Sequence, residues 1–366
     1  MSRERRKVLF VASHRPERAP NQRFRFEQYF PFLEEQGYDP ELSYLIDEET
    51  DRKLYSKGKL GAKLRFVIDS YIKRKKDLER IEDHDIVFVS REALMIRSTM
   101  FEKGVARSPT PMVLDIDDAV WLPNVSGNNA RFGWVKGAGK LHKSFRYADL
   151  IIAGNRYLAS YAGQYNANVR VIPTTIDTSY HRPLDIQRDE RICIGWTGSP
   201  TTVPHFELAL PYLEKIKELF GDRIRFKLIG DGDYYNENLG LQGQAWKKKS
   251  EVEDLADIDI GIMPLPDTEW AKGKCALKAL QYMAMEVPPV VSPVGVNPEV
   301  VEDGVNGYTP NTGTEWVEAL DRLIRDEELR RSLGVAARRT VEERYSVEAN
   351  KQDYLQVLED ALSSKG

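Results

Sequence analysis

Short apolar segments recur along the chain, separated by longer segments in which apolar residues return every three or four positions. The short runs are typical of buried strands, and the longer segments are typical of amphipathic helices. Their alternation predicts βαβ units and therefore parallel sheets. The expected strands are residues 8–12, 86–90, 112–114, 150–153, 169–172, 192–196, 225–229, 258–263 and 289–292.

The same pattern predicts helices and a boundary between two halves. A polar, proline-containing segment at 182–190 separates two series of strands and helices, so we expect two successive doubly wound α/β domains, residues 1–183 and 184–345. Ser346, followed by Glu348 and Ala349, marks the start of one more helix. The helices expected are 24–36, ended by Gly37, and 206–219, 275–286, 314–326, 327–345 and 346 to about 362.

Composition agrees with a two-domain soluble protein. The chain has 366 residues, of which 30% are charged and 41% hydrophobic, with a formal net charge of −4. This balance excludes a disordered or fibrous chain and argues against a nucleic-acid coat. The charge is uneven: residues 1–185 carry a net +6 and residues 186–366 a net −10. The two halves are therefore expected to meet different partners.

The chain has two cysteines, Cys193 and Cys275, and no apolar run long enough to cross a membrane. The cysteines lie far apart, without metal-ligand spacing, which favours a reducing compartment. The apolar run near the N-terminus is too short for the core of a signal peptide. We therefore expect a cytoplasmic protein.

Residues 53–80 are rich in lysine and arginine. Leu64, Ile68, Tyr71 and Leu78 recur there at helical spacing, beside the basic positions. One interpretation is a helix packed on the core with a solvated basic side. The other is a surface for anionic lipid headgroups or an anionic acceptor, which would place the protein peripherally at the inner face of a membrane.

The densest chemical signals lie in the second half. Residues 194–202 join a strand to a helix and contain Gly198 and Ser199, and Gly230 follows the next strand. Glycines allow close approach of a ligand, and the free amides of a helix start favour a phosphate. The alternative is an ordinary tight turn, since neither a dinucleotide fingerprint nor a P-loop is present.

The strongest run covers residues 270–284, followed by 287–297. Gly273 precedes a helix on which Lys274 and Lys278 are four residues apart and share one face. Two lysines at a helix N-terminus oppose the helix dipole, and a bound diphosphate would relieve that conflict. Gln281, one turn further along, could hydrogen-bond a ribose hydroxyl. A solvated lysine face is the alternative.

In the first half, His14 ends the first strand, and Arg23 and Arg25 open the following helix. The arginines could hold an anionic acceptor or the donor phosphates, or else pair with Glu27 or Glu34. Asp115, Asp117 and Asp118 cluster at another strand end. Metal binding by an Asp-x-Asp pair, helix capping by Asp117 or Asp118, and acceptor positioning by these two aspartates are all open interpretations.

These motifs together resemble glycosyltransferase family 4. The run Gly-Lys-Cys-x-x-Lys-x-x-Gln-Tyr-Met-Ala, then residues 287–297 and 303–308, is similar to that family's pattern, as are 148–155, 195–200 and 258–265. The resemblance covers most of residues 148–310 and implies the GT-B fold. In that fold two Rossmann-like domains face each other across a cleft, and the final helix, here 346–366, crosses back to the first domain.

The resemblance also implies roles for residues. The second half would bind a nucleotide-sugar, with Gly198 and Ser199 beside the diphosphate and Lys274 and Lys278 neutralising it in place of a metal or other cofactor. Gly273 and Gln281 fall where the family carries the two glutamates of a Glu-x7-Glu motif. Trp246 would pass the nucleobase, by stacking or by ordinary packing. Further donor contacts are expected at Gly230 and Asn297, and acceptor contacts at His14, Arg23, Arg25, Asp117 and Asp118.

The function implied is transfer of a sugar, with retention, to the hydroxyl of a glycan or lipid-linked acceptor. Synthesis of cell-surface glycan or glycolipid is the implied setting. Two rival functions remain open. One is a nucleotide-sugar epimerase of the same fold, which needs no acceptor, and the other is a non-catalytic nucleotide-sugar-binding scaffold. Nucleic acid is not expected as a partner.

Overall fold

The structure is a computed structural model and describes residues 5–54, 60–122, 138–187 and 189–365. It divides into two compact units, Met1–Pro173 with Asn350–Gly366, and Thr174–Ala349. The division after Pro173 falls ten residues before the boundary that the linker-like segment predicted. The last residues of the chain group with the first unit, and the change falls inside the final helix, α17 (Val347–Ser363).

The first unit contains a six-stranded, all-parallel sheet in the order β2-β1-β3-β4-β5-β6. The order reverses between β1 and β3, and open α/β sheets bind ligands beyond the carboxyl ends of their strands at such a point. The strands are β1 (Arg6–His14), β2 (Tyr38–Ile46), β3 (Ile86–Ser90), β4 (Met112–Ile116), β5 (Leu150–Ala153) and β6 (Val169–Val171).

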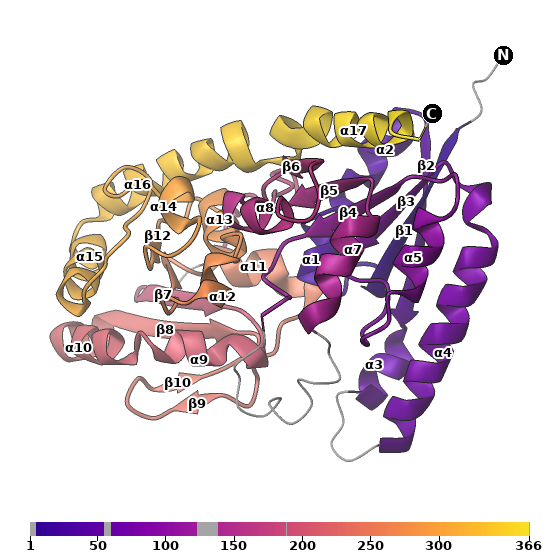
Figure 1. Ribbon diagram of the computed structural model, residues 1–366. Helices are drawn as coiled ribbons and strands as arrows, with labels where there is room; N and C mark the ends of the chain where they lie inside the picture. The colour runs from indigo at the N-terminus through magenta and orange to yellow at the C-terminus, as the bar shows by residue number, and fades with distance from the viewer. Residues whose placement is uncertain (1–4, 55–59, 123–137, 188, 366) are drawn as a thin grey trace. The chain divides into compact units, whose positions relative to one another are not determined.

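Helices cover both faces of this sheet (Figure 1). On one face an aromatic core includes Phe26, Phe88 and Tyr354, and the Tyr354 ring of α17 stacks on Tyr29 at 4.2 Å. On the other face α4 packs beside α5, with the Arg74 guanidinium over the Phe101 ring. The helices of this unit are α1 (Pro20–Arg23), α2 (Phe30–Glu35), α3 (Glu48–Leu54), α4 (Leu60–Glu79), α5 (Met100–Ala106), α7 (Leu141–Tyr147) and α8 (Arg156–Ala162).

The second unit contains a four-stranded parallel sheet in the order β12-β11-β7-β8, beside the short antiparallel pair β9 (Tyr235–Asn236) and β10 (Leu241–Gln242). Here the order reverses between β7 and β11. The parallel strands are β7 (Ile192–Thr197), β8 (Ile224–Ile229), β11 (Ile260–Met263) and β12 (Pro289–Val291).

Amphipathic helices bury both faces of the second sheet. One core joins Trp196, Phe206 and Leu213 to Trp316 and Leu320, while Tyr282 and Leu255 pack on the other face. The helices of this unit are α9 (Val203–Glu207), α10 (Leu210–Phe220), α11 (Glu251–Ala256), α12 (Glu269–Lys272), α13 (Leu277–Ala284), α14 (Asn297–Val300), α15 (Gly313–Arg325), α16 (Glu327–Thr340) and the π-helical η8 (Val341–Tyr345).

Three of the differences from the sequence-based expectation concern one strand and two helices. The strand β2 was not predicted, since Pro40 and alternating polar residues obscure it, and an edge strand tolerates both. The helix expected at 24–36 begins only after Phe26, with the short 3-10 turn Glu27–Tyr29 before α2. The helix expected at 206–219 is divided into α9 and α10, because Pro211 begins a new helix.

The helix α4 also corrects an expectation. Leu64, Ile68 and Tyr71 were interpreted first as a stripe packed on the core, but they are 65%, 51% and 43% exposed. Leu78 is half-buried. Lys57 and Lys59 of the predicted basic stretch lie outside the described residues.

Candidate functional site

The loop after β7 is fixed by its own side chains and by a buried tyrosine. The Ser199 side chain and Thr202 form a capping box over the 3-10 turn Pro200–Thr202, which leads into α9. The Thr197 amide donates to the Tyr282 hydroxyl at 2.9 Å, and that hydroxyl donates to the Ile262 carbonyl at 3.3 Å. The loop therefore holds one conformation at the point where the strand order reverses.

The loop after β8 lies directly against the loop after β7. Gly230 has φ = +129°, and a Cβ built on it would lie 2.3 Å from the Gly198 carbonyl oxygen. The Gly198 amide donates to the Ile229 carbonyl at 2.8 Å. Only glycine fits both this backbone conformation and this close approach, so the predicted pair Gly198 and Gly230 is brought together.

Two lysines and a histidine lie beside these glycine loops. Lys274 Nζ lies 3.6 Å from the centre of the Trp270 ring, and Lys278 Nζ lies 5.5 Å from the centre of the Trp196 ring. The His205 ring of α9 lies 5.5 Å from the Trp270 ring. Burial, Lys278 and Lys274 lower the pKa of His205 to about 4. The histidine is therefore neutral, and the two half-buried lysines supply the positive charge of this site, which suits an anion.

The backbone before α13 adds to this field. Gly273 ends α12, and Ala276, the residue at the N-cap of α13, is held left-handed at φ = +55° and has no side chain able to cap the helix. The first amides of α13 therefore receive no hydrogen bond from an N-cap side chain, and they lie at the positive end of the helix. A left-handed alanine is strained, and such strain recurs at ligand sites.

A buried carboxylate lies at the far end of the same helix face. Gln281 Nε2 lies 3.5 Å from Glu251 Oε1, and the Trp246 indole N–H donates to the same oxygen at 3.1 Å. Both Gln281 and Glu251 are buried. The Trp246 ring packs against the core around Leu255 and Tyr282. Glu251 was missed from the sequence, because nothing links it to a residue 30 positions further on.

The loop after β12 completes this edge of the sheet. Asn297 is fully buried, and its Nδ2 donates to the Ser292 carbonyl at 2.9 Å. Its Oδ1 has no hydrogen-bond partner within the described residues. Gly295, at φ = +60°, lies against the Lys272 backbone, so this loop and the one preceding α13 pack together.

In the first unit, His14 lies at the carboxyl end of β1. Its amide donates to Gln22 Oε1 at 2.8 Å. Arg15 and Arg18 both bind Asp51 Oδ2, at 2.8 and 2.7 Å. Burial, followed by the charge of Arg18, lowers the pKa of His14 to about 4, with smaller contributions from Arg15 and Arg91 and an opposing one from Asp51. Burial is thus the main reason why His14 is neutral, and three arginines reinforce it.

Arg25 has a partner that the sequence did not indicate. It forms a buried ion pair with Asp115, with Nη2 and Oδ1 2.6 Å apart, and it also donates to the Ile172 carbonyl at 2.8 Å. The two residues are 90 positions apart in the chain. Arg25 therefore holds β4 and the end of β6 to the first helical segment.

The remaining first-unit candidates make other side-chain contacts. Asp117 accepts two hydrogen bonds from Arg91, at 2.5 and 2.9 Å, and Asp118 lies 3.8 Å from the same guanidinium. Asp118 Oδ1 also accepts from the Ala119 amide. Residues 123–137 lie outside the described residues, so helix capping by Asp117 or Asp118 stays a prediction. Arg23 is buried, with its guanidinium over the Phe24 ring.

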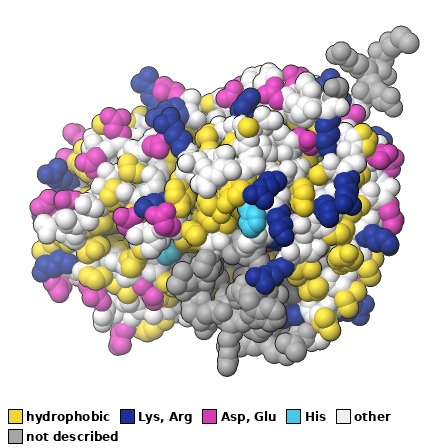
Figure 2. Space-filling model, in the orientation of Figure 1, with side chains coloured by type: hydrophobic (Ala, Val, Ile, Leu, Met, Phe, Trp, Pro, Cys, Tyr) yellow, Lys and Arg dark blue, Asp and Glu magenta, His cyan; other side chains and the backbone are white. Residues whose placement is uncertain are grey.

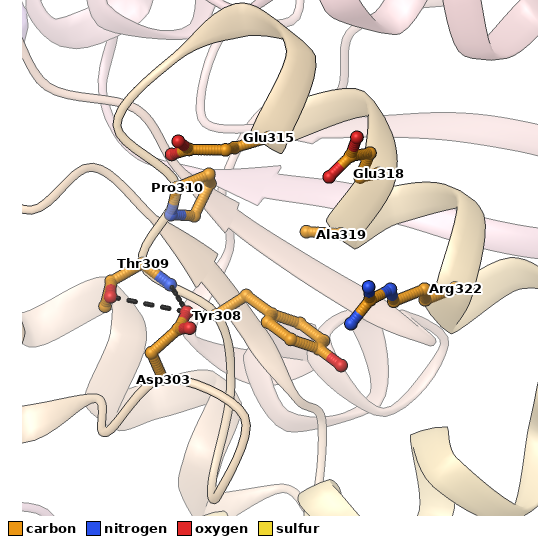
Figure 3. Close-up of a pocket in the computed structure, with 8 residues that line it drawn as sticks. All are labelled: Asp303, Tyr308, Thr309, Pro310, Glu315, Glu318, Ala319 and Arg322. Atoms are coloured by element: carbon orange, nitrogen blue, oxygen red, sulfur yellow. Dashed lines mark hydrogen bonds between the residues drawn. The ribbon is translucent and has the colours of Figure 1, made fainter.

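A surface pocket of about 150 Å³ lies elsewhere in the second unit (Figure 3). Its acidic side chains are largely committed to the fold. Asp303 accepts from the Thr309 amide, and Glu315 accepts from the amides of Asn311 and Thr312 at the start of α15. None of the predicted donor residues lines this pocket.

Part of the second unit matches a known protein family. Residues 192–326 match the family model for glycosyl transferases group 1. An N-acetyl-alpha-D-glucosaminyl L-malate synthase from Bacillus anthracis is 34% identical over 146 residues, which is 37% of this chain and 37% of that protein. The chain thus spans well under two thirds of the length of that relative.

Solved structures match along nearly the whole chain. Sucrose-phosphate synthase from Thermosynechococcus elongatus has a TM-score of 0.70 and 12% identity, covering 98% of this chain and 100% of that one. The Anabaena protein Alr3699/HepE in complex with UDP and glucose has a TM-score of 0.64 and 15% identity, covering 97% and 99%.

These likenesses define a protein of the GT-B fold, with a parallel α/β sheet in each of two units. The match of residues 192–326 to the glycosyl transferases group 1 model agrees with the resemblance of the chain to glycosyltransferase family 4. Among the described residues, no helix combines the length and apolar character needed to cross a bilayer.

Proposed function

We propose that this protein transfers a sugar from a nucleoside diphosphate sugar to a hydroxyl acceptor. The observation that carries the proposal is the positive cluster of Lys274 and Lys278, which lies with the neutral His205 beside the Gly198 loop. It lies beyond the carboxyl end of β7, where α/β folds bind ligands. The family of residues 192–326 and the UDP and glucose bound to the Anabaena protein support the same function.

The positive cluster would act on the leaving group. Breaking the sugar–phosphate bond puts negative charge on the departing diphosphate, and positive groups already fixed at that place lower the barrier. Lys274, Lys278 and the first amides of α13 would supply this stabilisation. With retention, the acceptor attacks from the leaving-group face, and a diphosphate oxygen takes the acceptor proton. No separate protein base is then needed.

The ribose and base would lie toward Gln281 and Trp246. Both side chains are oriented by hydrogen bonds to one buried oxygen of Glu251. Glu251 is thus proposed as a positioning residue. It supplies a carboxylate beside Gln281, at the position where relatives carry the second glutamate of their motif. Gly273 and Asn297 would line the same side through their loops.

The acceptor would bind to the first unit, beside His14. Arg15, Arg18 and Arg91 surround this histidine, and Asp117 and Asp118 orient Arg91. Guanidinium groups suit carboxylate or phosphate oxygens. An acceptor that carries such a group is therefore proposed, in synthesis of a cell-surface glycan or glycolipid on the cytoplasmic side.

Catalysis is proposed to need no metal. Asp115 and Asp117, the pair that resembles a metal-binding Asp-x-Asp, are each engaged by an arginine, Arg25 and Arg91. Lysines would neutralise the diphosphate instead. Transfer should therefore continue at full rate in excess EDTA, and loss of activity that added Mg²⁺ or Mn²⁺ restores would contradict this part of the proposal.

The test begins with a panel of nucleoside diphosphate sugars and free nucleoside diphosphates. At least one should raise the melting temperature of the full chain, since ligands that bind only the folded state stabilise it. With that donor, release of the diphosphate should depend on a hydroxyl acceptor. Conversion of the donor without acceptor would indicate an epimerase, binding without turnover over a broad acceptor panel would indicate a scaffold, and no stabilisation by any donor would overturn the proposal.

A further inference from the structure

The helix α4 is held to the first unit by a buried polar network. Arg74 is fully buried and donates to the carbonyls of Ala12 and Ala93, at 2.7 and 2.8 Å. It also donates to Asp77 at 2.8 Å, and Asp77 accepts from the Ser43 hydroxyl at 2.7 Å. Such a network fixes the rotation of the helix, because each buried donor and acceptor needs its partner.

With this rotation, apolar side chains of α4 point outward. Leu64, Ile68, Tyr71 and Ile72 are 65%, 51%, 43% and 48% exposed. Their spacing of four, seven and eight residues places them on one side of the helix. We call these four residues the α4 stripe. They form a contiguous apolar strip on the outside of one helix, which is unlike single exposed apolar residues scattered over a surface.

Basic residues flank the α4 stripe. The exposed or half-exposed charges on this helix are five basic residues and two acidic ones, Asp69 and Glu79, which leaves a net charge of +3 outside the buried Arg74–Asp77 pair. Figure 2 shows hydrophobic and basic side chains side by side at the edge where α4 lies in Figure 1. The five basic residues are Lys63, Arg65, Lys73, Lys75 and Lys76.

We propose that the α4 stripe and its basic flank form a docking surface for an anionic lipid bilayer. A helix with one apolar side and a basic border lies in the bilayer interface, with its apolar side among the acyl chains and its charges among anionic headgroups. Charge complementarity selects this occupant. A purely apolar partner would leave the lysines unused, and a purely acidic one would leave four apolar side chains uncovered.

The docking surface on α4 also extends the proposed function, and this one point depends on that function. A chain that docks on a bilayer works at the place where lipid-linked hydroxyls are concentrated. Docking itself does not depend on sugar transfer, because the α4 stripe contains none of the residues proposed to bind donor or acceptor.

The experiment is flotation of the full chain with vesicles of phosphatidylcholine alone or with added phosphatidylglycerol. Binding should appear with phosphatidylglycerol and fall as salt rises. The double variant Leu64→Gln/Ile68→Gln should bind at least about tenfold more weakly, since each side chain loses its contact with lipid. Lys75→Gln should weaken binding to anionic vesicles about fivefold, because one basic residue contributes about 1 kcal/mol near such a surface.

Matched controls come from the second unit. Leu219 and Val335 are 49% and 50% exposed but lie on α10 and α16. Leu219→Gln and Val335→Gln should leave vesicle binding unchanged. All variants should keep the wild-type melting temperature and its increase with donor. A change confined to flotation therefore reports on docking, and loss of the donor response would report on the proposed function instead.

Three outcomes would overturn the proposal. The first is no binding of the wild-type chain to anionic vesicles. The second is binding that the α4 variants leave unchanged. The third is a concentration-dependent dimer, seen by light scattering, that Leu64→Gln/Ile68→Gln returns to a monomer without changing vesicle binding, which would make a second copy of the chain the occupant of the stripe.

Discussion

The pair of Gln281 and Glu251 allows a prediction whose magnitude follows from the structure. In the Glu-x7-Glu motif that the resemblance implies, Gln281 falls at the position of the second glutamate, so Gln281→Glu introduces that one of the two glutamates. Here the new carboxylate would lie about 3.5 Å from Glu251 Oε1, with both side chains buried. At an effective dielectric constant of about 20, two like charges at that distance repel by about 5 kcal/mol.

Protonation limits that cost. A carboxyl group with an ordinary pKa of about 4.3 can be kept protonated at pH 7 for about 3.7 kcal/mol, which is less than the repulsion. The variant should therefore lose about 3–4 kcal/mol of unfolding free energy at pH 7. Its folded state binds an extra proton that the unfolded state releases, so stability falls as pH rises. At pH 5 the loss should shrink to about 1 kcal/mol.

Urea unfolding at the two pH values measures both numbers without any substrate. The matched control is the exchanged pair, Gln281→Glu with Glu251→Gln, which returns the site to one carboxylate. It should recover more than half of the loss, and the recovery is the coupling free energy. A loss below about 1 kcal/mol at pH 7, with no dependence on pH, would refute this account of why a glutamine stands at this position.

Three further predictions concern the positive cluster. Lys278→Ala should weaken binding of the stabilising nucleoside diphosphate, or slow transfer, by about 100-fold without lowering the melting temperature. The control Lys272→Ala, which removes a lysine paired with Glu269, should change binding and transfer by less than about twofold. His205, with a pKa of about 4 in the free protein, should take up part of a proton when the diphosphate binds near pH 6, and calorimetry in two buffers of different ionisation enthalpy should show this uptake in the wild type but not in His205→Gln. Ala276→Gly should raise the unfolding free energy by about 0.5–1 kcal/mol because it relieves the left-handed conformation, and a loss of stability in urea unfolding would contradict that reason.

The strands were the part of the fold most readable from the sequence. The predicted segments 86–90 and 150–153 coincide with β3 and β5, because a strand buried on both faces must be apolar throughout. The edge strand β2 carries no such requirement, and it was missed. Local spacing also predicted that Lys274 and Lys278 share one face of a helix, but α13 begins at Leu277, so only Lys278 lies on it and Lys274 lies in the connection before it.

Contacts between residues far apart in the chain could not be predicted from the sequence. Nothing in the sequence links Arg25 to Asp115, His205 to the two lysines, or Glu251 to Gln281, because sheet order and helix packing decide which of many oppositely charged or polar residues meet. The exposed side of α4 was misjudged for the same reason. Its periodicity shows that one side is apolar, but the buried contacts of Arg74 decide which side faces the protein.

Tyr282 has a consequence for how this site can change in evolution. Its ring lies over Gly261 of β11, where a Cβ would come within 2.3 Å of the ring. Its hydroxyl joins the Thr197 amide to the Ile262 carbonyl. Tyr282, on the helix that carries Lys278 and Gln281, thus holds β7 and β11 together. We therefore expect that a change of donor is selected at surrounding positions such as Ser199 and Trp270. Tyr282 and Gly261 should change together or not at all.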